Sequence, residues 1–85
     1  MLRTFLVEDE VIIRENIKRM VPWEKYGFEL VGEAADGAMA LPLIRKCRPD
    51  ILITDIKMPF MDGLTLSKLV KKEIPNIKIV ILSGY

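Results

Sequence analysis

Three apolar segments of the chain are each followed by residues that could bind a cation or a phosphate. Each segment is typical of a β-strand. The first is followed directly by Glu8-Asp9-Glu10, the second by Asp55 and the third by Ser83. Parallel strands of an α/β sheet end at one edge, where such folds bind ligands, so we expect these side chains to meet there. Crowded carboxylates repel one another unless a cation neutralises them, and a hard, oxygen-seeking ion such as Mg²⁺ suits that task.

The apolar periodicity predicts the elements that carry these residues. Strands are expected at 2–7, about 28–34, 51–54 and 78–82. Helices are expected over about 11–20, from Asp36-Gly37 to the basic pair Arg45-Lys46, and from the cap Asp62 to just before Pro75. The resulting β-α-β-α-β-α-β order argues for a parallel sheet with right-handed crossovers.

Local features give further expectations. The strand at 51–54 is apolar at successive positions, which predicts burial on both faces. Pro42 lies well inside the second helix, so a kink or a late helix start near Leu41 is expected. The first helix is expected to bury the stripe Ile13, Ile17, Met20 and Val21 and to turn Arg14, Glu15, Lys18 and Arg19 to solvent. Two aromatic side chains, Trp23 and Tyr26, are expected to cover one end of the sheet.

Taken together, the motifs resemble the receiver domain of bacterial two-component response regulators. The matching stretches are Val7-Glu8-Asp9-Glu10, Asp55-Ile56-Lys57-Met58-Pro59, Met61-Asp62-Gly63 and Leu82-Ser83-Gly84. Each stretch alone is a weak signal, whereas the ordered set is specific and covers essentially the whole chain. The resemblance implies a single domain over residues 1–85 with an α/β, flavodoxin-like parallel sheet of order 2-1-3-4 and flanking helices.

The same resemblance implies roles for the strand-end residues. Asp55 would accept a phosphoryl group from a partner sensor histidine kinase, which matches the known capacity of aspartate to form a covalent acyl phosphate. Asp9 and Asp55 would bind Mg²⁺ directly, Glu8 would bind it directly or through water, and the Lys57 carbonyl would be a further ligand. The Ser83 hydroxyl would contact the phosphoryl group and transmit the signal.

Family receivers continue beyond the fourth strand with a helix, a fifth strand and a last helix. The sequence stops at Tyr85, so we expect a receiver without this final α-β-α portion. The lysine that receivers carry on the fifth strand is then missing, which leaves efficient phosphotransfer and switching open. The segment around Trp23 and Tyr26 resembles receivers attached to AraC-type DNA-binding domains. Contact with DNA is therefore expected only indirectly, through an output domain outside these 85 residues.

Composition excludes several classes of function. The 85 residues are 51% hydrophobic and carry a net charge of +1, so the chain can bury a core but offers no basic field for nucleic acid. The absence of histidine excludes a histidine-based catalytic triad. The single cysteine, Cys47, excludes an internal disulfide and fits a reducing compartment. No apolar run is long enough for a signal peptide or a membrane span, so a cytoplasmic protein is expected.

Three other functions stay open at this stage. A module that works without phosphate chemistry could self-associate through the exposed edge of the fourth strand. A flavodoxin-like flavin or nucleotide carrier is disfavoured because Glu8-Asp9-Glu10 stands where such proteins place a phosphate-binding loop. A turnover enzyme is not expected, since no general acid beyond the carboxylate cluster and no substrate pocket can be inferred from the residues.

Overall fold

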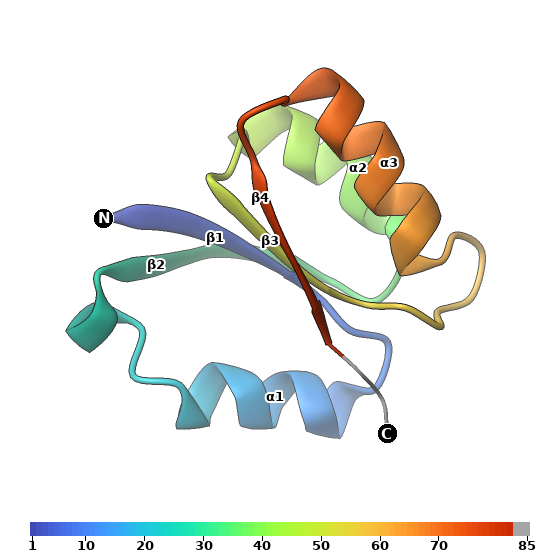
Figure 1. Cartoon of the computed structure of the whole chain (residues 1–85). Coiled ribbons are helices and arrows are strands. Elements are labelled where there is room, and N and C mark those ends of the chain that lie inside the picture. Colours follow the sequence, from blue (N-terminus) through green and yellow to red (C-terminus); the bar gives the residue numbers. More distant parts are fainter. Residues whose placement is uncertain (83–85) are drawn as a thin grey trace.

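A computed structural model describes residues 1–82 and shows a four-stranded sheet with helices on both faces (Figure 1). The elements in chain order are β1 (Leu2–Val7), α1 (Val11–Met20), the 3-10 turn η1 (Glu24–Tyr26), β2 (Phe28–Ala34), α2 (Gly37–Cys47), β3 (Ile51–Asp55), α3 (Gly63–Glu73) and β4 (Lys78–Leu82). The strand order β2-β1-β3-β4, with every neighbouring pair parallel, confirms the predicted topology.

The main core lies between the sheet and the helices α2 and α3, which lie side by side on one face (Figure 1). Its buried side chains come from alternate positions of the strands and from the inner faces of the two helices; among them are Phe5, Val7, Leu52, Ala40, Ile44, Leu66 and Val70. Burying an aliphatic or aromatic side chain of this size contributes about 1.5–3 kcal/mol. This cluster therefore helps to hold β1 and β3 in position relative to each other.

Within residues 1–82, the opposite face of the sheet is covered incompletely, by α1 and by Trp23. Among residues 11–20 none is fully buried. Ile17 and Val21 turn inward, but Ile13 is 41% exposed and Met20 is 75% exposed, so the predicted stripe is wrong at these two positions. In β3 the buried positions alternate, and Ile51 and Ile53 are only half-buried. The expectation that β3 is buried on both faces is therefore wrong, because no helix of residues 1–82 covers β3 and β4 on this side (Figure 1).

The second helix begins at Gly37, so the expected late start near Leu41 is wrong. The side chain of Asp36 accepts a hydrogen bond from the Met39 N–H at 2.9 Å, which caps the first turn as predicted. Pro42 lies inside the helix and removes one hydrogen bond, the one that would reach the carbonyl of Ala38. Both Pro42 and Ala38 are exposed, so water can solvate that carbonyl and the core contacts of α2 offset the remaining cost.

Two aromatic residues after α1 were predicted to cover one end of the sheet, and the prediction holds for Trp23. Trp23 packs over the sheet, and its indole N–H donates to the Lys18 carbonyl at 3.0 Å. Tyr26 is 62% exposed, so it contributes little to the expected cover. Tyr26 is the last residue of η1. The chain then reverses at Gly27, which has a φ of +81°, before β2 begins.

Candidate acidic site at the strand ends

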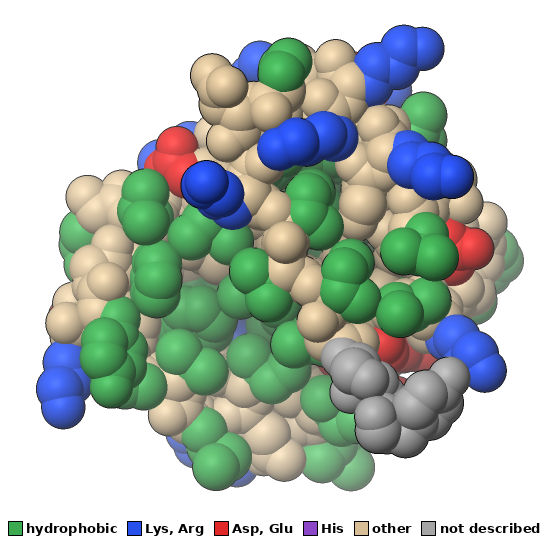
Figure 2. Space-filling view, in the orientation of Figure 1, with side chains coloured by type: hydrophobic (Ala, Val, Ile, Leu, Met, Phe, Trp, Pro, Cys, Tyr) green, Lys and Arg blue, Asp and Glu red, His purple; other side chains and the backbone are tan. Residues whose placement is uncertain are grey.

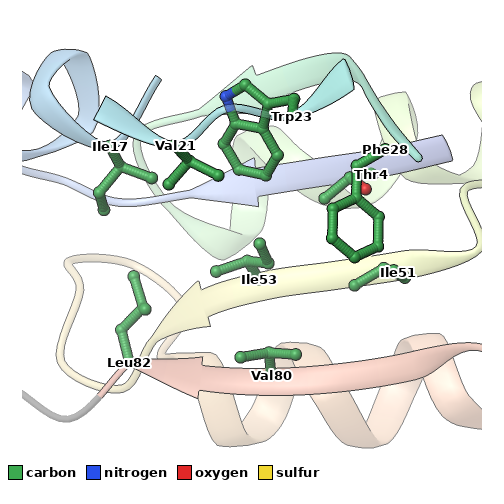
Figure 3. Close-up of a pocket in the computed structure, with 9 residues that line it drawn as sticks. All are labelled: Thr4, Ile17, Val21, Trp23, Phe28, Ile51, Ile53, Val80 and Leu82. Carbon is green, nitrogen blue, oxygen red and sulfur yellow. The ribbon is translucent and has the colours of Figure 1, made fainter. Parts of the chain in front are cut away.

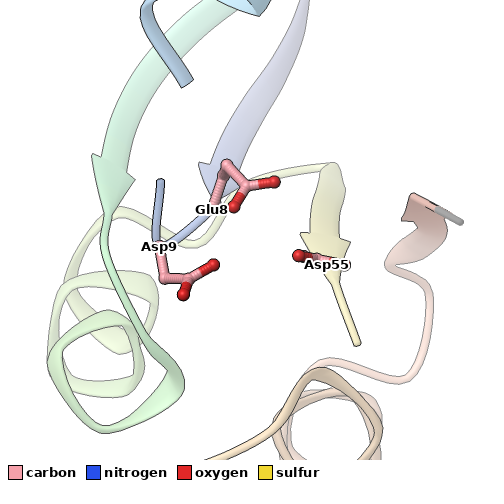
Figure 4. Close-up of side chains that lie close together, drawn as sticks. All are labelled: Glu8, Asp9 and Asp55. Atoms are coloured by element: carbon pink, nitrogen blue, oxygen red, sulfur yellow. The ribbon is translucent and has the colours of Figure 1, made fainter. Parts of the chain in front are cut away.

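The carboxylates of Glu8, Asp9 and Asp55 come together, as the strand ends predict (Figure 4). Each contributes one oxygen to a group in which all the oxygens lie within 4.8 Å of one another. The reason is the register of the sheet, in which Val7 of β1 pairs with Thr54 of β3. Glu8 follows Val7 and Asp55 follows Thr54, so both lie at the same edge of the sheet and at the same position along their strands.

Glu8 is the most enclosed of the three, with only 3% of its surface exposed. Its Oε2 accepts a hydrogen bond from the Glu10 N–H at 3.0 Å. Burial raises the pKa of Glu8 above its ordinary value, the bond from Glu10 opposes that shift, and the nearby Asp55 and Asp9 raise it further. A buried carboxylate with two acidic neighbours is stabilised in its charged form by a cation, and an all-oxygen donor set fits Mg²⁺.

Asp55 ends β3 with its side chain directed into the cluster (Figure 4). Its Oδ1 accepts a hydrogen bond from the Ile56 N–H at 2.8 Å, which limits how the carboxylate can rotate. The Thr54 hydroxyl donates to the main-chain oxygen of Asp55 at 2.9 Å. Asp55 is half-buried, so solvent reaches part of this residue.

The loop over residues 56–62 is attached at both of its ends. Near its start, the Ile56 carbonyl accepts from the Gly63 N–H at 2.7 Å, and near its end the Met61 carbonyl accepts from the Gly37 N–H at 3.2 Å. Met58 and Met61 pack against the core, which gives them a structural role in this loop. Lys57 is exposed in this loop. The role of its carbonyl as a metal ligand stays a prediction.

Asp62 caps α3 as predicted, since its Oδ1 accepts from the Thr65 N–H at 2.7 Å. That bond lowers the pKa of Asp62 below its ordinary value, and the positive end of the helix favours an anion there. The Ser83 position lies outside the described residues, so its predicted contact with a phosphoryl group stays a prediction.

One polar residue near the site was placed wrongly by the helical pattern. Arg14 was expected to face solvent, but its side chain is only 14% exposed. Its Nη1 donates to the Glu8 carbonyl at 2.6 Å, and its Nε donates to Glu33 on β2 at 3.0 Å. The pattern could not reveal this contact, because Glu33 lies nineteen positions away along the chain.

Comparison with known proteins places the fold and the acidic edge in one family. Residues 4–85 match the response regulator receiver domain, and the chain belongs to this family. Receiver domains and response regulators are signalling modules rather than enzymes, and receivers generally bind Mg²⁺ at an acidic site of this kind.

Individual proteins agree with this assignment. Over the whole chain the sequence is 46% identical to an uncharacterized response regulatory protein of Staphylococcus epidermidis, of which it covers 33%. The receiver domain of AraT, a response regulator from Geobacillus stearothermophilus, superposes with a TM-score of 0.94 at 40% identity, covering 99% of this chain and 65% of that one.

A two-component transcriptional regulator AraC from Clostridium phytofermentans superposes with a TM-score of 0.92 at 33% identity, covering 100% of this chain and 68% of that one. The chain spans about a third of the length of the first curated relatives that it matches. Among residues 1–82, the helices are all too short or too polar to cross a membrane.

Proposed function

We propose that the chain is the phosphoacceptor module of a two-component signalling system and that Asp55 receives the phosphoryl group from a partner sensor histidine kinase. The observation that carries the proposal is the convergence of Glu8, Asp9 and Asp55 at one sheet edge. A structural role for three crowded carboxylates is disfavoured, because the fold would bear their repulsion without a cation to neutralise it. Membership of the receiver family supports the same assignment.

The proposed reaction is a transfer between a phosphohistidine and a carboxylate. An oxygen of Asp55 forms a bond to phosphorus while the bond between phosphorus and the donor nitrogen breaks. The donor imidazole keeps the electron pair of that bond and takes up a proton from solvent. The hydrogen bond from the Ile56 N–H to Oδ1 leaves the other carboxylate oxygen, Oδ2, free to attack.

The acidic residues would hold the metal ion on which such transfers depend. We propose Glu8, Asp9 and Asp55 as its protein ligands, with the Lys57 carbonyl as a further ligand and Ser83 as a contact to the phosphoryl group. When bound, Mg²⁺ neutralises charge on the carboxylate and on the transferred group. The main contribution of this chain is to hold the three carboxylates in place before the donor arrives.

The test is the mass of the intact protein after incubation with acetyl phosphate, with and without Mg²⁺. A gain of one phosphoryl group that requires Mg²⁺ is expected for the wild-type chain and is expected to be lost in Asp55→Asn. Asp50→Asn is the matched control, because Asp50 lies at the opposite end of β3 and is exposed. If Asp55→Asn gained the same mass as the wild type, the assignment of Asp55 would be wrong.

The remaining functional expectations extend this proposal to the cell. We propose a cytoplasmic module of one domain over residues 1–85, acting on DNA only through an output domain outside this sequence. The similarity to a two-component transcriptional regulator supports that route. The added charge of about −1.5 to −2 would then bias a two-state surface that the output domain senses.

A second candidate function, self-association of the 85-residue chain, rests on its uncovered sheet face. Apolar side chains gather on this face over β3, β4 and α1 (Figure 2). They surround a cavity of about 340 Å³ that is lined by Thr4, Ile17, Val21, Trp23, Phe28, Ile51, Ile53, Val80 and Leu82 (Figure 3). The edge strand β4 contributes Val80, which is 45% exposed, to this surface. We propose that a second copy covers this surface, since bare apolar faces and strand edges recruit partners.

Light scattering over a range of concentrations tests the second candidate. The wild-type chain is expected to dimerise with rising concentration, and Val80→Lys is expected to shift it to monomer. Leu64→Lys is the control, because Leu64 is 52% exposed on α3, away from this cavity. A wild-type chain that stays monomeric at every concentration would contradict the proposal without affecting the role of Asp55.

A further inference from the structure

We propose that Arg14 is a positioning residue that sets the geometry of the acidic loop after β1. The inference rests on the proposed metal and phosphoryl site, which it deepens. Arg14 is the residue of α1 whose guanidinium reaches back to this loop, where Nη1 donates to the Glu8 carbonyl at 2.6 Å. Its main-chain N–H also donates to the Glu10 carbonyl at 2.9 Å. The main-chain bond is the first helical bond of α1, so the bond from Nη1 to the Glu8 carbonyl is the one that depends on the arginine side chain.

The guanidinium is itself held from the other side by β2. Its Nε donates to Oε1 of Glu33 at 3.0 Å. The second oxygen of Glu33, Oε2, is taken by Lys18 at 2.6 Å, one helical turn further along α1. Both oxygens of Glu33 therefore have a basic partner. This fixes the orientation of the Arg14 guanidinium as well as its distance from Glu33. A lysine at position 14 could satisfy only part of this geometry.

The peptide that Arg14 holds joins two of the three acidic residues. The Glu8 N–H donates to the Ala34 carbonyl at 3.1 Å, and the Glu8 carbonyl accepts from Arg14. Each of the two peptides that flank Glu8 is thereby held by a hydrogen bond, and the bond from Arg14 is the one that holds the peptide between Glu8 and Asp9. Because their carboxylates leave the backbone from adjacent positions, fixing this peptide sets the directions in which both can point.

The role of Arg14 differs from that of the carboxylates. It touches the main chain of Glu8, and we assign it no contact with the metal or the phosphoryl group. Partners of this kind, which orient a ligand without binding the metal, typically change metal affinity 10–100-fold when removed. The expected loss is in the geometry of the loop, with the three carboxylates still present.

The experiment compares Arg14→Gln and Arg14→Lys with Arg19→Gln in the full 85-residue chain. Arg19 is the matched control, because it lies on the same helix and bonds only the Asn16 side chain among residues 1–82. The first readout is Mn²⁺ affinity, followed by the electron paramagnetic resonance signal of the free ion. The second readout needs no metal: it is the hydrogen exchange of the Glu10 amide, which donates to Glu8 Oε2.

For Arg14→Gln we expect Mn²⁺ affinity to fall about tenfold and exchange of the Glu10 amide to accelerate about tenfold. Arg14→Lys should recover part of both losses, and Arg19→Gln should change neither. Unfolding in urea identifies the fraction of each variant that is folded, and if Arg14→Gln does not fold, Arg14→Lys against Arg19→Gln decides the question.

The two proposals fail in different ways. Wild-type affinity and wild-type exchange in both Arg14 variants would overturn the positioning role and leave the metal site standing. A wild-type chain that binds no Mn²⁺ would overturn the metal site. In that case the exchange of the Glu10 amide still decides whether Arg14 holds the loop.

Discussion

Gly63 lies directly against the main chain of Asp55. A Cβ atom added at Gly63 would stand 1.8 Å from the Asp55 carbonyl oxygen and 3.1 Å from the Thr54 hydroxyl oxygen. The neighbour in closest contact is backbone, so it cannot move aside as the end of a flexible side chain can. The first residue of α3 therefore packs onto the end of β3, and this contact connects the helix start to the proposed phosphoacceptor.

The first prediction concerns this contact. Gly63→Ala should separate α3 from β3, lower the free energy of unfolding by about 2–4 kcal/mol and weaken Mg²⁺ binding by displacing Asp55. Urea unfolding and calorimetric titration with Mg²⁺ measure the two effects. Gly27→Ala is the control: its φ of +81° also strains an alanine, but no atom lies within 4 Å of the added carbon. It should lose stability and keep the metal affinity.

The second prediction concerns the buried acid of the site. Glu8→Gln should make the metal-free chain at least as stable as wild type at neutral pH, because burial disfavours the charge of Glu8 and an amide can still accept from Glu10. Mg²⁺ should stabilise the variant far less than the wild type, which would gain about 2.7 kcal/mol at a hundred times its Kd. Urea unfolding with Mg²⁺ and with a chelator gives both values. Equal stabilisation of the two chains by Mg²⁺ would exclude Glu8 as a ligand.

The third prediction concerns pH. The hydrogen bond from Lys18 lowers the pKa of Glu33 below its ordinary value of 4.5, and Arg14 adds to the shift. Glu33 therefore stabilises the fold above that value, and this stability is lost as the pH falls through the lowered pKa. Glu33→Gln should cost less than about 1 kcal/mol near neutrality, because solvent screens these pairs.

Urea unfolding of both chains between pH 3 and pH 7 measures this difference, which should shrink below about pH 4.5. Glu29→Gln is a suitable control, because Glu29 is an exposed residue of the same strand. A difference that stays constant across this range would show that the ion pairs of Glu33 contribute nothing.

The fourth prediction compares the two helix caps. Asp36 is only 4% exposed, and its replacement by alanine should cost about 1–2 kcal/mol, since the Met39 N–H loses its acceptor in a place that water reaches poorly. Asp62→Ala should cost less, because Asp62 is exposed and water can replace it. Thermal unfolding ranks the variants, and Asn at either position should restore most of the loss. A larger loss for Asp62→Ala would reverse this argument.

Strand ends and helix caps could be predicted because they depend on neighbours in sequence. The apolar periodicity predicted the bounds of β1 and the start of α1, and the position of Asp36 before Gly37 indicated a cap. The clustering of Glu8, Asp9 and Asp55 then followed from topology alone, since the carboxyl ends of parallel strands lie at the same edge of a sheet.

Other features were decided by contacts between segments far apart in the chain. Arg14 faces inward because Glu33 on β2 and the Glu8 carbonyl accept hydrogen bonds from it, which no periodicity within α1 can show. Ile53 is only half-buried, because its burial depends on which elements pack over β3 and not on the sequence of β3 itself. Pro42 stays within a continuous helix because tertiary packing offsets a local penalty.

The sequence by itself thus determined the order of the elements and the three acidic side chains at one edge. The tertiary structure decided what surrounds them: the buried state of Glu8, the arginine that holds its peptide, and the glycine that lets α3 touch Asp55. The physical reason is that local preferences act through the backbone of a few residues. Burial, charge pairing and close packing depend on distances that exist only once the chain has folded.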